Sequence, residues 1–393
     1  MLDHSPAAPI ATATARPRAL TVGLDVSPLG EPRTGIGRYA YELLGALWFV
    51  AQDQDIVPVG NRALTDRDIP SRPTGSSTVR GPRFPSRAAW TFGLLPFWLP
   101  EAGMDLFHGT SYYAPFVRDV PTVVTFHDMT VLARPDLHPA TRVLRARAVL
   151  RRVAERAAAI ITLSESTKLD VIRCLEVAPE RIHVVPGAAA SCFRPSADPT
   201  GGREVLARYR LEGGGFLLAV GTLEPRKNLI RVFEAVGRLR RSGHPVRLVV
   251  AGRRGWNYRP ILQRVGRLGL SDAIDFIGFV PDNDLACLMR AAAGLVYPSL
   301  CEGFGLPVIE AMASGLPVVT SDTGALREVA GGAALLVDPT DVDSIAAGML
   351  AVLDERGGRQ LRDAGLCRAS QFSWHRTARA TLSVYQTVVG QGG

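Results

Sequence analysis

Short apolar runs rich in Val, Ile and Leu alternate along the whole chain with longer stretches whose apolar residues recur at helical spacing. Such alternation is typical of parallel sheets with helices on both faces. In the first half the pattern predicts helices over 37–50, 140–157 and 164–174. It predicts strands over 20–26, 56–59, 105–108, 121–126, 159–163 and 182–185.

A second series begins near residue 216. It predicts a helix over 228–241 and strands over 216–220, 246–252, 274–280, 294–298, 317–321 and 333–337. Between the two series, "RPSADPTGGRE" (194–204) is rich in Pro and Gly and indicates a linker. We therefore expect an α/β protein in which two open parallel sheets face a cleft, with ligands at the carboxyl ends of the strands.

The expected boundaries follow from this division. They are a disordered tail over 1–17, an N-terminal domain over 18–195, a C-terminal domain over 205–370, and a C-terminal helix over 371–393 that returns toward the N-terminal domain.

Composition narrows the class of protein. Of 393 residues, 47% are hydrophobic and 21% charged, which indicates an ordered globular chain of about two domains. We predict a cytoplasmic protein, because no apolar run is long enough for a membrane span, the N-terminus lacks the apolar core of a signal peptide, and the five cysteines are scattered. The net charge of +8 and pI of 9.6 suit an anionic partner: a nucleotide, a lipid phosphate, a membrane surface or nucleic acid.

Gly35-x-Gly37-x-x-Ala40 matches the spacing of a dinucleotide-binding fingerprint. However, about eight residues separate Val26 from Gly35, where the fingerprint requires a tight turn, and no acid follows the second strand. A nicotinamide oxidoreductase is therefore disfavoured. We interpret the segment as a mobile loop whose glycines, with a helix starting near Gly37, bring backbone amides to a phosphate or sugar.

The strongest chemical signal is "YPSLCEGFGLPVIEAMASGLP" (297–317). Pro307 suits the first turn of a helix that runs to Ser314, and Gly315 suits its left-handed cap. The helix N-terminus would offer free amides to a diphosphate. Glu310 in its early turns could accept hydrogen bonds from a ribose diol, and Glu302 on the preceding loop could reach sugar hydroxyls.

A second signal, "GTLEPRKN" (221–228), follows the first strand of the second series. Gly221 permits a close turn, and Arg226 and Lys227 present a guanidinium fork and a point charge suited to a diphosphate.

These segments, together with "GALREVAGGAALLVDP", resemble glycosyltransferase family 4, retaining enzymes of the GT-B fold, which has two Rossmann-like parallel-sheet domains. The similarity covers nearly the whole chain from about residue 18. The resemblance implies that Glu302 contacts the donor sugar, that Glu310 binds the ribose, and that Arg226 and Lys227 bind the diphosphate. It further implies that Phe304, Gly305 and Leu306 hold sugar and phosphate through their amides, that Phe279 and Val280 edge the base, and that the Gly35 and Gly37 loop covers the phosphates.

"TFHDMT" (125–130) places His127 and Asp128 just past a strand on the cleft side of the first domain. The resemblance implies a histidine here near the reacting sugar carbon, so His127 and Asp128, together with Glu302, are candidate catalytic residues. A role for His127 as a base and a role as a positioning group are both open at this point.

Three Asp-x-Asp strings, at 53–55, 282–284 and 341–343, could in principle bind a divalent metal. All three fall before a strand or at a helix start, where Asp is a favoured cap, so we interpret them as structural. No cofactor and no metal are expected, since Arg226, Lys227 and a helix N-terminus could stabilise the leaving diphosphate.

The expected activity is transfer of a hexose, mannose first, to a glycan or lipid-linked saccharide. GDP-mannose is the favoured donor and a UDP-hexose the second. The Arg-rich stretch 142–157 could contact the inner face of a membrane or an acceptor phosphate, although a solvated helix face is the simpler interpretation. Alternatives are a nucleotide-sugar epimerase on the same fold and a basic nucleic-acid-binding protein. The latter is disfavoured because no aromatic-basic recognition module is visible.

Overall fold

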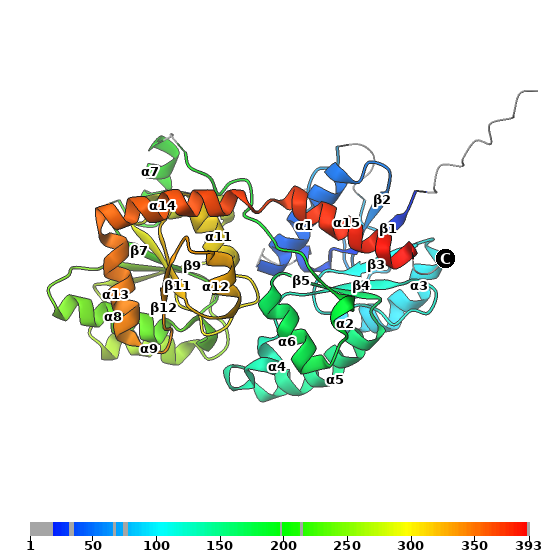
Figure 1. The fold of residues 1–393 in the computed structure, drawn as a ribbon, viewed down its shortest axis with the longest axis horizontal. Coiled ribbons are helices and arrows are strands. Elements are labelled where there is room, and N and C mark those ends of the chain that lie inside the picture. Colours follow the sequence, from blue (N-terminus) through cyan, green and yellow to red (C-terminus); the bar gives the residue numbers. More distant parts are fainter. Residues whose placement is uncertain are drawn as a thin grey trace, which may run out of the picture.

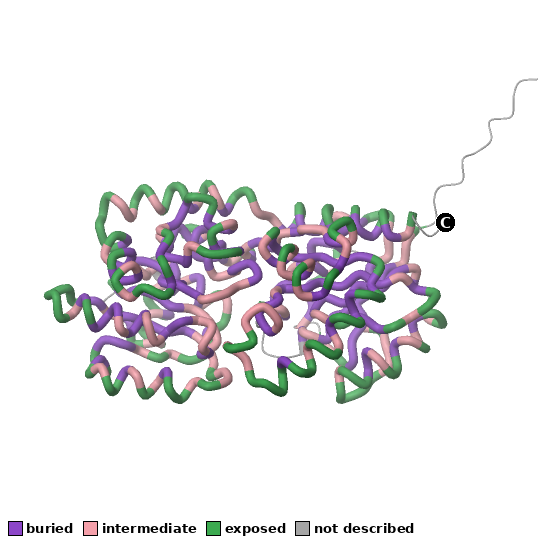
Figure 2. The backbone as a smooth tube through the Cα atoms, turned by 60° about the horizontal axis from the view of Figure 1, so that its bottom comes forward, coloured by how far each residue is buried: buried purple, intermediate pink, exposed green. Residues whose placement is uncertain are grey.

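The computed structural model describes residues 19–30, 35–65, 68–73, 78–196, 199–212 and 215–390. They form two lobes side by side, one for each half of the chain (Figure 1). Buried backbone is concentrated inside each lobe, as Figure 2 shows. The predicted tail over 1–17 lies outside the described residues, as do 391–393 at the end of the predicted C-terminal helix.

The first lobe is a six-stranded parallel sheet in the order β2-β1-β3-β4-β5-β6. Its strands are β1 (Thr21–Asp25), β2 (Asp55–Val59), β3 (Leu106–Gly109), β4 (Thr122–Phe126), β5 (Ala159–Thr162) and β6 (Ile182–Val184). Its helices are α1 (Gly35–Val50), α2 (Arg87–Ala89), α3 (Leu95–Glu101), α4 (Thr130–Ala133), α5 (Ala140–Arg156) and α6 (Glu165–Leu175). The apolar β4 is buried along its whole length, as expected for a central strand covered on both faces.

The second lobe is also a six-stranded parallel sheet, in the order β12-β11-β10-β7-β8-β9. Its strands are β7 (Leu217–Val220), β8 (Leu248–Ala251), β9 (Ile274–Gly278), β10 (Gly294–Tyr297), β11 (Val318–Ser321) and β12 (Leu335–Val337). Its helices are α7 (Pro199–Arg208), α8 (Leu229–Arg241), α9 (Tyr258–Arg267), α10 (Asp282–Ala291), α11 (Leu306–Ala313), α12 (Gly324–Ala330), α13 (Val342–Leu353) and α14 (Glu355–Ser370). Each strand predicted from the sequence is present, within a few residues at its ends.

Two local predictions are wrong. The segment interpreted as a linker over 194–204 is helical from Pro199, where α7 begins and packs against α10. Proline is tolerated in the first turn of a helix, so Pro199 starts α7 and does not prevent it. Gly35 was assigned to a mobile loop but belongs to the first turn of α1, whereas the predicted helix start near Gly37 is confirmed within two residues. Residues 31–34 of the predicted loop lie outside the described residues.

The last helix, α15 (Trp374–Gly390), crosses back and packs against α1 in the first lobe (Figure 1). Its Tyr385 is buried and its hydroxyl lies 2.6 Å from Nδ1 of His108 on β3. The other ring nitrogen of His108 lies 2.8 Å from Thr125 Oγ1, so α15 is joined to the first sheet by a buried polar network as well as by apolar packing.

In each sheet the strand order reverses once, between β1 and β3 in the first and between β7 and β10 in the second. Ligands of open α/β sheets bind outside the carboxyl ends of the strands at such reversals. The loops after these strands therefore mark where a ligand site is expected. Among the helices of the described residues, none is long and apolar enough to cross a bilayer.

Candidate active site

A cavity of about 430 Å³ lies between the lobes at the carboxyl ends of the strands. Except for Gly37, every residue predicted for the site lines it: Gly35, His127, Asp128, Gly221, Arg226, Lys227, Val280, Glu302, Phe304, Gly305, Leu306 and Glu310. Residues far apart in the sequence are thus brought together by the two strand-order reversals.

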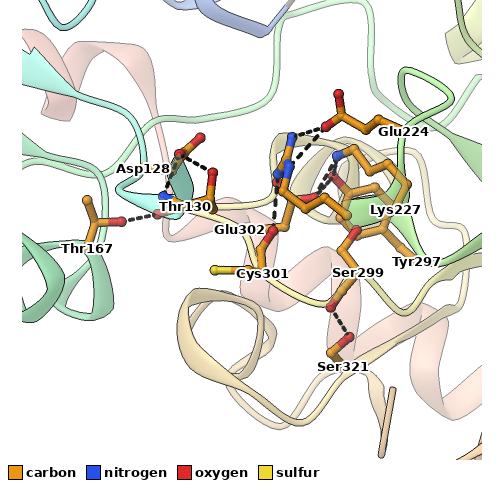
Figure 3. Close-up of polar contacts among 12 residues, drawn as sticks. Asp128, Thr130, Thr167, Glu224, Lys227, Tyr297, Ser299, Cys301, Glu302 and Ser321 are labelled. Atoms are coloured by element: carbon orange, nitrogen blue, oxygen red, sulfur yellow. Dashed lines mark hydrogen bonds and ion pairs between the residues drawn. The ribbon is translucent and has the colours of Figure 1, made fainter. Parts of the chain in front are cut away.

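Glu302 is the centre of a charged cluster on the loop after β10. Lys227 donates from Nζ to its Oε1 at 2.6 Å, and Arg226 pairs with its Oε2. Tyr297 donates its hydroxyl hydrogen to Glu302 at 2.9 Å, and Glu224 accepts from Arg226 Nε at 2.9 Å. In Figure 3, Glu224 and Lys227 approach Glu302 from the second lobe, while Asp128 and Thr130 lie on the other side.

The loop after β7 is shaped to let Lys227 reach this cluster. Gly221 has φ 138°, and a Cβ at this position would come within 2.9 Å of Lys227 Cε. A glycine is therefore needed both for the backbone conformation and for the passage of the lysine side chain.

Burial and charge set the ionisation of the cluster. Burial alone would raise the pKa of Glu302, but the attraction of Arg226 and Lys227 outweighs it and lowers the pKa to about 2. Burial lowers the pKa of Lys227, against the opposing attraction of Glu302. Two cations and an ionised carboxylate, each with little of its side chain exposed, therefore lie in direct contact.

Helix α11 points its N-terminus into the cavity. Gly305, with φ 98°, precedes the helix, and Leu306 and Pro307 form its first turn. The helix ends at Ala313, and Gly315 follows with φ 75°, so the predicted start and cap are confirmed. Pro307 has no amide hydrogen and Val308 donates its own to the carbonyl oxygen of Gly305 at 2.9 Å, so the Leu306 amide is the one in this turn that can reach a ligand. This amide and the partial positive charge of the helix N-terminus suit an anionic group beside Lys227.

His127 follows β4 and is 9% exposed. Its Nε2 lies 2.7 Å from the carbonyl oxygen of Thr110, so Nε2 carries the hydrogen and Nδ1 is left as an acceptor. Burial lowers the pKa of His127 to about 4, so the ring is neutral near pH 7. Tyr39 meets it edge-on, with ring centroids 4.9 Å apart. The geometry suits a neutral ring that accepts a hydrogen bond from a sugar hydroxyl.

Asp128 turns back on its own loop. Its Oδ1 accepts from the amide of Thr130 at 2.9 Å and from the hydroxyl of Thr130 at 2.7 Å. Burial would raise the pKa of Asp128, but Arg226 of the opposite lobe and the Thr130 hydrogen bonds lower it. Asp128 therefore adds a negative charge that faces Arg226 across the cavity.

The lobes touch at Gly303, next to Glu302. Its carbonyl oxygen accepts from Ser164 Oγ at 2.7 Å and from Thr167 Oγ1 at 3.0 Å, and the Thr167 bond is drawn in Figure 3. A Cβ on Gly303 would overlap the carbonyl oxygen of His127. The loop that carries Glu302 is thus fixed directly against the segment that carries His127.

Trp256 and His138 also line the cavity, although the sequence did not indicate them. Trp256 donates from Nε1 to the carbonyl of Leu137 at 3.0 Å, stacks on His138 with centroids 5.4 Å apart, and lies under Arg142 at 4.9 Å. Val280 and Phe279 line the cavity as well; Val280 is buried, whereas Phe279 is 43% exposed beneath Arg253. These contacts depend on how the two lobes are placed. The one sequence signal for them was the position of Trp256, in the loop that follows β8.

A third residue that the sequence did not indicate is Arg38, which reaches from α1 to Glu310 and Asp282. The sequence carried one signal for this contact. A positive charge in the first turn of a helix is unfavourable next to the positive end of the helix dipole, so Arg38 near the start of α1 suggested an acidic partner from another segment.

The Asp-x-Asp strings take part in structural contacts. Asp282, in the first turn of α10, pairs with Arg38 of α1. Asp284 accepts a hydrogen bond from Arg208 at 2.6 Å. Asp341 caps α13 by accepting from the amide of Asp343 at 2.9 Å, and Asp55 at the start of β2 pairs with Arg72 at 3.0 Å.

Comparison with known proteins supports the same division of the chain. Residues 33–189 match a family model described as "Glycosyltransferase Family 4". Residues 207–364 match one described as "Glycosyl transferases group 1".

Two curated relatives show the extent of the similarity. "O-antigen chain mannosyltransferase B" of Escherichia coli is 32% identical over 382 residues, 91% of this chain and 97% of the relative. "MMP alpha-(1->4)-mannosyltransferase" of Mycolicibacterium hassiacum is 36% identical over 248 residues, 61% of this chain and 57% of that relative.

Solved structures share the fold at low sequence identity. Sucrose-phosphate synthase from Thermosynechococcus elongatus superposes with a TM-score of 0.74 at 21% identity, covering 95% of this chain and all of that one. HepE of Anabaena, solved with UDP and glucose, gives 0.73 at 18% identity, covering 94% of this chain and all of that one.

Proposed function

The chain belongs to glycosyltransferase family 4 and is a hexosyltransferase of the GT-B fold, and from this premise we propose that it transfers mannose from GDP-mannose to a saccharide or lipid-linked saccharide, with retention at the anomeric carbon. The observation that carries the proposal is the cluster of Arg226, Lys227 and Glu302 beside the N-terminus of α11, at the strand-order reversal of the second sheet.

In this proposal Arg226, Lys227 and the N-terminus of α11 hold the donor diphosphate. These groups already face the cavity, so little reorganisation is needed when negative charge develops on the leaving phosphate. The diphosphate would share the two cations with Glu302, which is then available to sugar hydroxyls. Neutral His127 accepts from the sugar through Nδ1 and positions it, and the protein contributes chiefly orientation and charge stabilisation.

The choice of mannose is supported by the relatives. The Escherichia coli and Mycolicibacterium hassiacum proteins are both named mannosyltransferases. A UDP-hexose is the second candidate, since HepE of Anabaena was solved with UDP. We further propose that no metal is essential, because Arg226 and Lys227 supply the positive charge that a divalent ion supplies in other phosphoryl-binding sites.

The donor assignment predicts selective stabilisation in EDTA. GDP-mannose at about 100 times its Kd should raise the unfolding midpoint by about 5 °C, because a ligand that binds only the folded form adds its binding free energy to stability. UDP-glucose, ADP-glucose, dTDP-glucose and NAD serve as comparison ligands in the same thermal scans. Product formed from GDP-mannose and an oligomannose acceptor should keep the α configuration in NMR spectra. Stabilisation by NAD alone would overturn the proposal, and a stronger shift with UDP-glucose would replace the donor.

A peripheral contact with the inner face of a membrane is the second part of the proposal. Helix α5 exposes Arg145, Arg147 and Arg152, which have no ion-pair partner among the residues the structure describes, and Leu144, which is 71% exposed. Arg142 at the start of α5 lines the cavity. An anionic bilayer along α5 would therefore bring a lipid-linked acceptor to the cavity mouth.

Replacing both Arg145 and Arg152 by Gln should weaken binding to phosphatidylcholine vesicles that contain phosphatidylglycerol by about tenfold or more, since each basic residue near an anionic surface contributes about 1 kcal/mol. Cosedimentation measures the effect. The matched control replaces Arg356 and Arg359 of α14 by Gln, which removes the same charge from the second lobe. Equal losses in both variants would indicate non-specific attraction and would contradict the α5 contact.

A further inference from the structure

Arg38 joins the two lobes inside the cavity. It lies in the first turns of α1, and 9% of the residue is exposed. Its Nε donates to Asp282 Oδ2 at 3.1 Å, its Nη2 pairs with the other oxygen of Asp282, and its Nη1 pairs with Glu310 Oε1. One guanidinium from the first lobe thus holds two carboxylates of the second.

Glu310 is left half satisfied by this contact. Its side chain is fully buried and lines the cavity, with Oε1 on Arg38. Its Oε2 has no hydrogen-bond partner among the described residues. A buried carboxylate oxygen without a donor is costly, so a ligand hydroxyl placed here would gain more than one placed in water.

We propose that Arg38 is a positioning residue for the donor. Its guanidinium pairs with Asp282 and with Oε1 of Glu310, and so leaves Oε2 of Glu310 available to a ribose hydroxyl of the nucleotide. This inference rests on the proposed function. Because Arg38 comes from the opposite lobe, the ribose contact forms fully only when the lobes are together, and donor binding favours the closed arrangement.

Arg38 also keeps Glu310 able to accept a hydrogen bond. Burial raises the pKa of Glu310, the attraction of Arg38 lowers it, and the charge of Asp282 raises it again. Among the residues that the structure describes, the thiol of Cys192 also lies close to this group; burial raises its pKa to about 11, so it stays neutral. Without Arg38, only the effects that raise the pKa of Glu310 remain.

The test compares Arg38→Met with the wild-type protein by calorimetric titration with GDP and UDP, and with their 2′,3′-dideoxy forms, which lack the ribose hydroxyls. For the nucleotide that the wild type prefers, the variant should lose about tenfold or more in affinity, while the dideoxy nucleotide should bind both proteins equally. The loss should grow as pH falls, beginning at higher pH than in the wild type, because protonation removes the negative charge of Glu310 and makes it a weaker hydrogen-bond acceptor.

Equal losses for the normal and dideoxy nucleotides would show that Arg38 is only structural and would overturn the proposal. No loss at all would do the same. Arg38→Lys, which keeps the charge but has no fork to bridge two carboxylates, should show a smaller loss and serves if the methionine variant does not fold. The matched control is Arg247→Met, which breaks a 2.8 Å pair with Asp275 on β9. Failure of the wild type to bind either nucleotide would instead overturn the proposed function itself.

Discussion

Lys227→Met is expected to lower kcat/KM for the donor by about 100-fold or more, equivalent to about 3 kcal/mol of lost transition-state stabilisation. Lys227 lies next to Glu302 and Tyr297 with 10% of its side chain exposed, so its charge is poorly screened by water. Steady-state kinetics with varied donor measure the effect.

The chain supplies a matched control. It contains two lysines, Lys168 and Lys227, and all its other basic side chains apart from histidine are arginines. Lys168 lies on α6 and does not line the cavity, so Lys168→Met removes the same charge without touching the site. Lys227→Arg should recover little, because a planar guanidinium does not replace a compact ammonium in the gap beside Gly221. Near-normal turnover of Lys227→Met would remove the donor-site assignment.

Gly303→Ala should be nearly as damaging, although it adds only one methyl group. That carbon would overlap the His127 carbonyl oxygen and come within 2.7 Å of Asp128 Cβ. Both obstacles belong to the backbone or lie next to it, so the loop after β10 or the loop after β4 must move. A shift of about 1 Å between groups that hold one substrate can cost about 100-fold in rate, which should appear in kcat.

Gly266→Ala is the control for this substitution. Gly266 lies on the exposed face of α9, where an added methyl group would meet no other part of the described chain within 4 Å. Alanine is also the better helix former by up to about 1 kcal/mol. The substitution should leave kcat unchanged and stability equal or slightly higher. If Gly303→Ala kept full activity, the contact between Gly303 and His127 would not belong to the working enzyme.

Local sequence patterns, with the family resemblance, were enough to predict the strands, the start and end of α11, and part of the cavity lining, including His127, Lys227 and Glu302. The reason is that parallel strands place their carboxyl ends together, so motifs after strands converge whatever the details of packing. Contacts between lobes were not predictable in the same way. Arg38, Trp256 and the fit of Gly303 against His127 depend on how two separate sheets face each other.

The two incorrect local predictions have a common cause. Glycine and proline were interpreted as signs of irregular chain at 199–204 and at Gly35, but all of these positions lie in or near first turns of helices. In a first turn the amide that proline lacks has no intrahelical partner to lose. Buried Val205 of α7 and buried Tyr39 of α1 supply the packing that continues each helix.

Because α15 completes the first lobe, the second lobe is an insertion within the first and not a module appended to it. A chimera that exchanges the second lobe between two relatives therefore needs two junctions, one before α7 and one between α14 and α15. A single junction would import a foreign terminal helix onto α1 and would lose the pairing of Tyr385 with His108. If the second lobe binds the donor as proposed, a chimera with both junctions should change the donor and leave the first lobe intact.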